Sequence, residues 1–246
     1  MTISTCLITA RAGSFFKDKC LQPILGKSCL DRAIHAAKTS NLFDQIYVST
    51  NSTMISKECV SNGITTIDRP QEVSHDTAAH IDVINHALNS FERIADSLCI
   101  ILPDNPFISV NLLIKSFNLL ASDRLITSII PVYQDIDHHQ LRSKVITSNG
   151  RLRSYGSYHG LAGIESPSTN RQSLQPSYFP SHNFWLLKVR HLVGQGDNRR
   201  LLEDGEPQWA FFGPLSIPII MPFSHDIHTD IDISICENLL SCYEGV

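Results

Sequence analysis

The first half of the chain alternates short apolar runs with segments of helical apolar spacing. The runs are typical of buried strands, and we expect strands over residues 5–10, 45–49, 64–67, 98–102 and 126–132. Between the strands, apolar residues recur at helical spacing over residues 29–37, 52–62, 79–95 and 110–120. This order predicts an α/β fold with a mainly parallel sheet and helices on both faces.

The second half is less regular. Residues 138–176 are polar and rich in Ser, Gly and His, and Asn149-Gly150 is a strong hairpin signal. A long segment without periodicity is usually a lid, a dimer arm or an excursion. Two apolar runs follow at 184–187 and 217–221, then a short helix over 233–240. We predict a single Rossmann-like three-layer domain over residues 1–246, with 138–176 as an arm for dimerisation or substrate binding.

Composition excludes several classes of protein. The chain has 246 residues and a formal net charge of -4. It has no basic stripe, which argues against nucleic-acid binding. We expect neither a signal peptide nor a membrane span, and therefore a cytoplasmic location. The seven cysteines are odd in number and form no CxxC pair, which favours reduced thiols over disulfides or a zinc site.

Ligands in open parallel sheets bind at the carboxyl ends of the strands, so the loop after the first strand is a candidate site. It reads ARAGSFFKDKCLQPILGKS. Gly13 lets backbone N–H groups approach phosphate oxygens. Four basic residues supply positive charge, namely Arg11, Lys17, Lys19 and Lys27. The loop is not a P-loop, because GxxxxGK[ST] is absent. The alternatives are a triphosphate cradle and a solvated basic loop.

Five segments in order resemble the sugar-acid cytidylyltransferases, whose best-known members are the CMP-sialic acid synthetases. They are LITARAGS, SNLFDQIYVSTN, DRPQEVSHDTAAHIDVINHAL, RQSLQPSY and DIHTDIDISICENLL. Any one motif is weak, but the order is specific for the family. The resemblance implies transfer of CMP from CTP to a sialic-acid-like nine-carbon sugar acid, with release of pyrophosphate. It also implies Mg²⁺ as the cofactor and a homodimer.

The resemblance assigns a nucleotide site to nine residues, and it gives Arg11 and Lys19 catalytic contacts with the CTP phosphates. The nine are Ala10, Arg11, Ala12, Gly13, Ser14, Lys19, Cys20, Arg69 and Asp104. Fixed cations at these phosphates stabilise the charge that builds in the transition state. Arg69 is expected to read the base carbonyl. Cys20 stands where the family carries an asparagine that touches the cytosine.

The metal site is implied by the last motif. The resemblance assigns Asp226 and His228 to the family's DID pair, whose side chains would lie on one side of an extended strand. It also makes Asp226 a catalytic residue. A register with a gap would choose Asp230 and Asp232 instead, and a turn with capping aspartates is the plain alternative. We prefer the register without a gap, in which Asp232 caps the final helix. Asp104, in LPDNPF, resembles the octulosonate-activating branch, where GDxP helps to hold Mg²⁺.

The sugar acid is assigned to Arg171, Gln172 and Tyr178 of RQSLQPSY, because arginine suits a planar carboxylate. Two alternatives stay open. The first is a nucleotidyltransferase for another acid sugar, of the octulosonate, pseudaminic or legionaminic type. The second is a catalytically impaired nucleotide-binding relative, suggested by Cys20, Asp104 and His228. A plain binding module would leave the ordered motifs unexplained.

Overall fold

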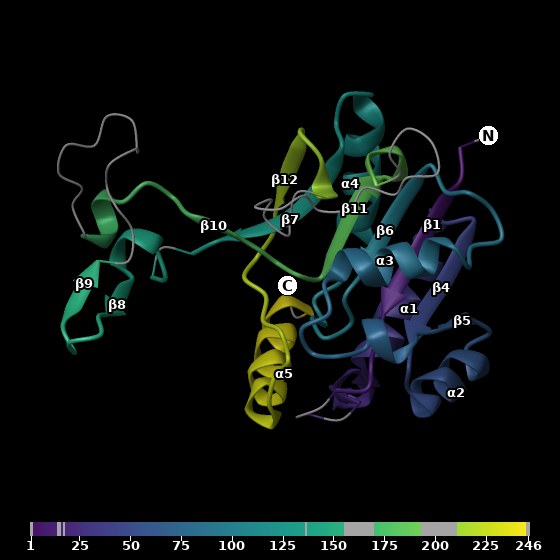
Figure 1. Cartoon of the computed structure of the whole chain (residues 1–246), viewed down its shortest axis with the longest axis horizontal. Helices are drawn as coiled ribbons and strands as arrows, with labels where there is room; N and C mark the ends of the chain where they lie inside the picture. The colour runs from purple at the N-terminus through teal and green to yellow at the C-terminus, as the bar shows by residue number, and fades with distance from the viewer. Residues whose placement is uncertain are drawn as a thin grey trace. The chain divides into compact units, whose positions relative to one another are not determined.

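A computed structural model describes residues 2–13, 16, 18–135, 137–154, 170–192 and 211–244. The chain divides into two compact units (Figure 1). The first comprises residues 1–131, 181–219 and 224–246, and the second comprises 132–180 and 220–223. The first unit carries the parallel strands, so it is the one that positions the predicted nucleotide site.

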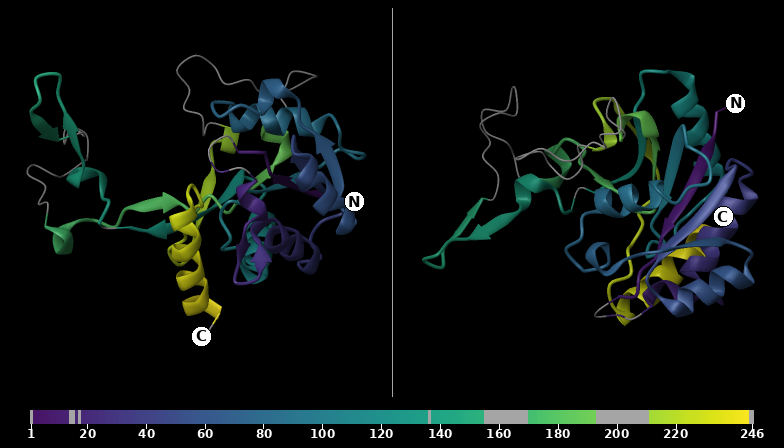
Figure 2. Two further views of the ribbon diagram at one scale, coloured as in Figure 1. Left: turned by 90° about the horizontal axis from the view of Figure 1, so that it is seen from below. Right: turned by 45° about the vertical axis from the view of Figure 1, so that its right-hand side comes forward.

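The sheet has β1 at its centre, paired in parallel with β4 on one side and β6 on the other (Figure 2). Across the sheet the order is β5 (Thr65–Asp68), β4 (Gln45–Thr50), β1 (Ser4–Thr9), β6 (Ser97–Ile101), β11 (Phe184–Lys188) and β7 (Ser128–Gln134). β11 runs antiparallel to both its neighbours, β6 and β7. A further strand, β12 (Ser216–Ile220), pairs with β7. The predicted mainly parallel α/β fold is confirmed, with an antiparallel strand inserted.

The central strands form the core. Cys6, Leu7 and Ile8 of β1 have no exposed surface, and the same holds for residues 98–101 of β6. Strands covered on both faces read as continuous apolar runs, which is why the sequence indicated them. All seven cysteines are free thiols, and all but Cys242 are buried.

Serine caps position three of the helices. Ser28, Ser52 and Ser109 each accept a backbone N–H in the first turn of the helix that follows. The helices are α1 (Cys29–Thr39), α2 (Thr53–Ser61), α3 (His80–Leu88), α4 (Val110–Ser122) and α5 (Asp230–Glu244). α1 contacts both β1 and α4, and Figure 1 shows α3 crossing in front of the sheet. No helix in the described ranges is long and apolar enough to cross a membrane.

The helix predicted over 79–95 is shorter in the structure, because α3 ends at Leu88. The Asn89 and Ser90 amides still donate to carbonyls of α3, but two later amides bond to side chains of β4. The Glu92 amide donates to the Tyr47 hydroxyl, and the Arg93 amide donates to Gln45 Oε1. Phe91 stacks on Tyr47 with ring centroids 5.0 Å apart. These long-range contacts turn an apolar stretch with helical spacing into a loop.

The second unit contains the predicted hairpin. β8 (Lys144–Ile146) pairs with β9 (Leu152–Ser154), and Gly150 has φ of 76° in the turn between them. β10 (Tyr178–Pro180) pairs antiparallel with the end of β7, where Phe179 stacks on Tyr133. The described residues of this unit also form two short helices, η3 (Gln140–Arg142) and η4 (Arg171–Ser173). The roles expected for 138–176, part of which lies outside the described residues, stay predictions.

Candidate active site

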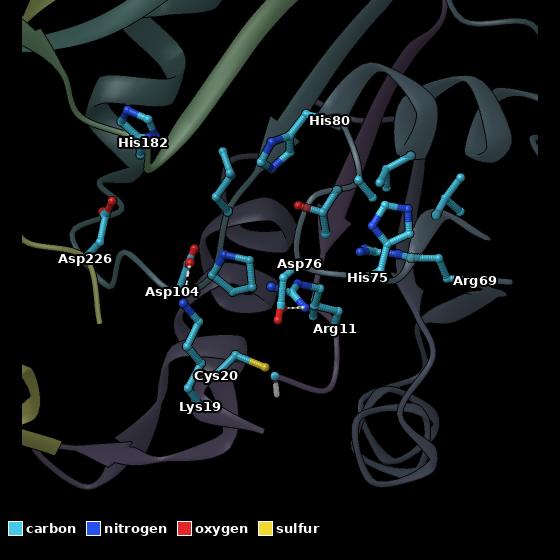
Figure 3. Close-up of a pocket in the computed structure, with 18 of the residues that line it drawn as sticks. Arg11, Lys19, Cys20, Arg69, His75, Asp76, His80, Asp104, His182 and Asp226 are labelled. Carbon is cyan, nitrogen blue, oxygen red and sulfur yellow. Dashed lines mark hydrogen bonds and ion pairs between the residues drawn. The ribbon is translucent and has the colours of Figure 1, made fainter. Parts of the chain in front are cut away.

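A cavity of about 290 Å³ opens at the carboxyl ends of the parallel strands of the first unit (Figure 3). This volume is close to the lower end of ligand pockets, roughly 300 Å³. The loops after β1, β5 and β6 meet there with the start of α3 and the segment before α5. Nine of the predicted site residues line it, namely Ala10, Arg11, Gly13, Lys19, Cys20, Arg69, Asp104, Asp226 and His228.

The loop after β1 is held by local contacts. Arg11 pairs with Asp76 at 2.6 Å, and both side chains are partly exposed. The Ala12 amide donates to Asn51 Oδ1 at 2.9 Å, which ties the loop to the end of β4. A Cβ on Gly13 would lie 2.5 Å from the Phe16 carbonyl oxygen, so this position requires glycine. Ser14 lies outside the described residues.

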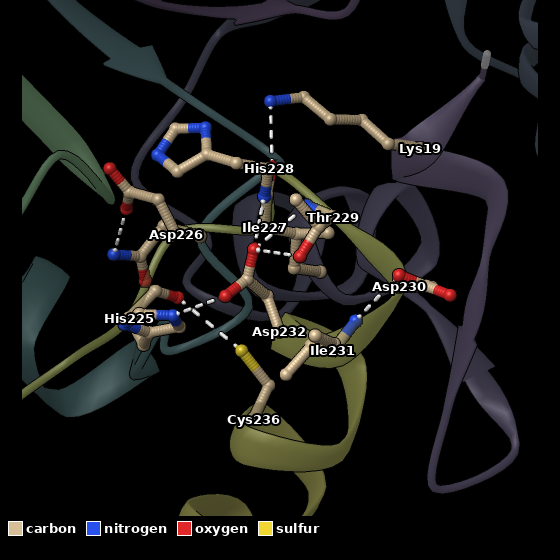
Figure 4. Close-up of polar contacts among 11 residues, drawn as sticks. Lys19, His225, Asp226, Ile227, His228, Thr229, Asp230, Ile231, Asp232 and Cys236 are labelled. Carbon is tan, nitrogen blue, oxygen red and sulfur yellow. Dashed lines mark hydrogen bonds and ion pairs between the residues drawn. The ribbon is translucent and has the colours of Figure 1, made fainter. Parts of the chain in front are cut away.

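Lys19 contacts two loops that are distant in sequence, the one with Asp104 (Figure 3) and the one with Ile227 (Figure 4). It begins the short helix η1 (Lys19–Leu21). Its ammonium lies 2.8 Å from Asp104 Oδ2 and donates at 2.8 Å to the carbonyl of Ile227. The Ile227 amide in turn donates to the Asp104 carbonyl at 2.8 Å. A cation and a carboxylate from separate elements therefore meet in the cavity.

Asp226 supplies a second carboxylate. It is half-buried, and Asn105 Nδ2 donates to its Oδ1 at 2.8 Å. Burial and the nearby charge of Asp104 raise the pKa of Asp226, and the hydrogen bond from Asn105 partly opposes them. A bound cation or a phosphate-bound metal would relieve the repulsion between the two carboxylates.

The DID region differs from the extended strand that we expected. Asp226 and His228 lie in the loop between β12 and α5, and Asp230 to Asp232 form the first turn of α5. Asp232 Oδ2 accepts the backbone amides of His228 and Thr229, so the predicted capping role of Asp232 is confirmed. Asp230 and Asp232 therefore act in helix capping, because their carboxylates accept amides that are free at the start of a helix.

The carboxylates do not form a complete metal cage. Within the described ranges, no group of three or more His, Cys, Asp or Glu side chains is arranged to hold a metal ion. Asp104, Asp226 and His228 all line the cavity nonetheless. Their metal-binding role stays a prediction.

The opposite wall carries Arg69, whose side chain is buried. Its guanidinium donates to the Ser49 hydroxyl at 3.1 Å and to the Ser49 carbonyl at 2.8 Å. Burial and the charge of Arg11 lower the pKa of Arg69 to about 10, so it stays cationic at neutral pH. Burial also raises the pKa of Cys20 to about 12, so Cys20 presents a neutral thiol.

Histidines His75, His80 and His182 also line the cavity. His80 begins α3 and packs edge-on against Trp185, with ring centroids 5.0 Å apart. Burial lowers the pKa of His80, which favours a neutral ring. His182 has φ of 47°, an uncommon backbone conformation for a residue other than glycine.

The predicted sugar-acid residues belong to the second unit. Arg171 and Gln172 lie in η4, and Tyr178, which is 47% exposed, begins β10. Their role in substrate binding stays a prediction.

Sequence reasoning missed Asn105, which has no exposed surface and contacts Asp226. The available signal was a polar residue between Asp104 and Pro106, directly after a buried strand. His182 lies just before β11, whose antiparallel direction was not predicted.

A sequence model described as cytidylyltransferase matches residues 5–147. The chain belongs to the cytidylyltransferase family. It is 29% identical over 182 residues to the N-acylneuraminate cytidylyltransferase of Streptococcus agalactiae, covering 72% of this chain and 41% of that one. It is 24% identical over 244 residues to N-acylneuraminate cytidylyltransferase A of Danio rerio, covering 95% of this chain and 50% of that one.

These cytidylyltransferase relatives are longer, and the chain spans about half of their length or less. A solved structure of CMP:2-keto-3-deoxy-manno-octonic acid synthetase complexed with CTP shares the fold. Its TM-score is 0.66 at 13% identity, over 98% of this chain and 100% of that one.

Proposed function

We propose that this chain transfers CMP from CTP to an acidic sugar of the sialic acid type and releases pyrophosphate. The observation that carries the proposal is one cavity lined by Arg11, Lys19, Asp104 and Asp226. Cations suit the triphosphate, and the carboxylates suit the divalent cation that accompanies it. Family membership supports the same chemistry.

In this proposal Arg11 and Lys19 hold the phosphates, while Arg69 and Cys20 face the cytidine. The anomeric hydroxyl oxygen of the sugar acid attacks the α-phosphorus. The bond from that phosphorus to the bridging oxygen breaks, pyrophosphate leaves, and the hydroxyl proton is released. Positioning of the two substrates lowers the barrier, and fixed positive charge stabilises the leaving group.

Mg²⁺ fits the residues present. It is usually bound through one or two carboxylates together with waters and substrate phosphates, rather than by a complete protein cage. Asp226 and Asp104 would supply those carboxylates, with His228 beside them. When bound, the ion would neutralise charge that develops on the phosphates. Arg171, Gln172 and Tyr178 would bind the sugar acid, and residues 138–176 would form a homodimer contact.

An eight-carbon octulosonate is the second candidate acceptor. It is favoured by Asp104, which resembles the aspartate of that branch and contacts Lys19. The test incubates the chain with CTP, Mg²⁺ and either N-acetylneuraminate or the octulosonate, followed by ³¹P NMR. We expect pyrophosphate and a CMP-sugar diester with one acceptor. A folded protein that gives neither product with any sugar acid would contradict the proposal.

A further inference from the structure

Two dipeptides face each other at the base of the cavity, Asp104-Asn105 after β6 and Asp226-Ile227 before α5. The Asp104 carbonyl accepts the Ile227 amide at 2.8 Å, and Lys19 bridges the Asp104 carboxylate and the Ile227 carbonyl. The third connection is the hydrogen bond from Asn105 to Asp226 at 2.8 Å. Asn105 is therefore bonded to one carboxylate of the cavity and is the chain neighbour of the other.

The orientation of the Asn105 amide is determined by its surroundings. Its Oδ1 accepts the Phe107 amide at 3.1 Å, so Nδ2 must point the other way. Nδ2 lies 2.9 Å from the Ser181 carbonyl, 2.8 Å from Asp226 Oδ1 and 3.1 Å from Ser224 Oγ. The amide nitrogen can only donate, so its two hydrogens are directed at the oxygens of Ser181, Asp226 and Ser224.

Burial makes this arrangement rigid. Asn105 has no exposed surface, and its partners Ser181 and Ser224 are 1% and 5% exposed. The two serine hydroxyls lie 2.7 Å apart and complete the network. A buried network with its polar groups paired has few alternative arrangements. The Asp226 carboxylate is consequently held by one oxygen and cannot rotate freely.

We propose that Asn105 is a positioning residue that orients the Asp226 carboxylate for the divalent cation of the nucleotide. This inference rests on the proposed function. Partners that orient a metal-binding carboxylate typically change metal affinity roughly 10- to 100-fold when they are removed. A purely structural asparagine would affect folding stability alone.

The test replaces Asn105 by alanine and measures Mn²⁺ binding in the presence of CTP by electron paramagnetic resonance. We expect the Kd for Mn²⁺ to rise about 10-fold or more. Asn85→Ala is the matched control, because Asn85 is also a buried asparagine (8% exposed) but lies in α3, outside the cavity lining. That variant should lose stability and keep its Mn²⁺ affinity. If Asn105→Ala does not fold, Asn105→Ser, which keeps a hydroxyl donor, is measured in its place.

A double variant separates positioning from general disorder. If Asn105 acts through Asp226, Asn105→Ala adds nothing to the loss of Mn²⁺ affinity in Asp226→Asn. Additive losses, or an unchanged Kd for Mn²⁺ in the folded single variant, would overturn the positioning role of Asn105. The proposed function would still stand if the wild type releases pyrophosphate. A wild type that neither binds Mn²⁺ with CTP nor releases pyrophosphate would overturn both.

Discussion

Lys19 forms an ion pair of 2.8 Å with Asp104, which joins the loop after β1 to the loop after β6. The same ammonium donates to the Ile227 carbonyl, so it sits among three segments of the cavity. We expect an entering triphosphate to draw Lys19 away from these oxygens. The residue is thus placed to respond to the nucleotide rather than only to stabilise the fold.

Replacing Lys19 by methionine keeps the length of the side chain and removes its charge. Loss of one group that stabilises transition-state charge typically costs roughly 100- to 1,000-fold in rate, and we expect a loss of that order in kcat/KM. Pyrophosphate release from CTP and sugar acid measures it. Lys27→Met is the control, because Lys27 is an exposed basic residue in β3 (Lys27–Ser28). Equal losses in both variants would show that Lys19 has no special role.

Replacing Arg11 by alanine should abolish turnover and leave the fold intact. The Arg11–Asp76 pair has side chains that are 35% and 47% exposed, and such pairs stabilise a fold by about 0–1 kcal/mol. Thermal unfolding should therefore change little. Arg93→Ala, which removes the exposed pair with Asp44, provides the comparison. Unchanged pyrophosphate release from Arg11→Ala would remove Arg11 from the site.

Gly13→Ala tests the shape of the loop after β1. The new Cβ would lie 2.5 Å from the Phe16 carbonyl oxygen, so the backbone must shift. Small misplacements of substrate-binding groups cost up to roughly 100-fold in rate, and we expect weaker CTP binding by calorimetry and slower turnover. Gly63→Ala is the control. Gly63 follows α2 with φ of 64°, so alanine is strained there too, but Gly63 does not line the cavity. CTP affinity equal to wild type in Gly13→Ala would contradict the account of this loop.

The cap of α5 gives a prediction about pH. Burial opposes ionisation of Asp232, but hydrogen bonds from His225 and from the His228 and Thr229 amides lower its pKa well below the usual range. A lowered folded pKa means that the stabilisation is complete above the unfolded pKa of about 4 and is lost as pH falls further. Asp232→Ala should cost about 1 kcal/mol at pH 7 in urea unfolding.

This difference from wild type should shrink as the pH falls below about 4. Asp230→Ala is the comparison, because the Asp230 carboxylate accepts the adjacent Ile231 amide, whereas Asp232 accepts the amides of His228 and Thr229. A difference that grows in acid would contradict the assignment of the cap.

Local patterns predicted the parts of the fold that depend on nearby residues. The apolar runs of β1 and β6 and the helical spacing of α2 were all visible in sequence. The early end of α3 was not, because it depends on Tyr47 and Gln45, more than 40 residues away. The antiparallel direction of β11 was likewise not visible, because it depends on pairing with β6 and β7, which are distant in sequence.

The site divides in the same way. Arg11, Gly13 and Lys19 follow a recognisable strand and were found from their loop. Asn105 escaped notice, because its contact with Asp226 joins residues 121 positions apart. Asp226 was found only through an ordered motif, since nothing local distinguishes it from the capping aspartates 230 and 232.

The most direct test of the nucleotide site is a crystal structure of the protein soaked with CTP and Mg²⁺. We predict triphosphate oxygens within hydrogen-bond distance of Arg11 and Lys19, with the cation on Asp226. CTP bound elsewhere on the molecule, or a triphosphate that contacts neither basic residue, would contradict the account.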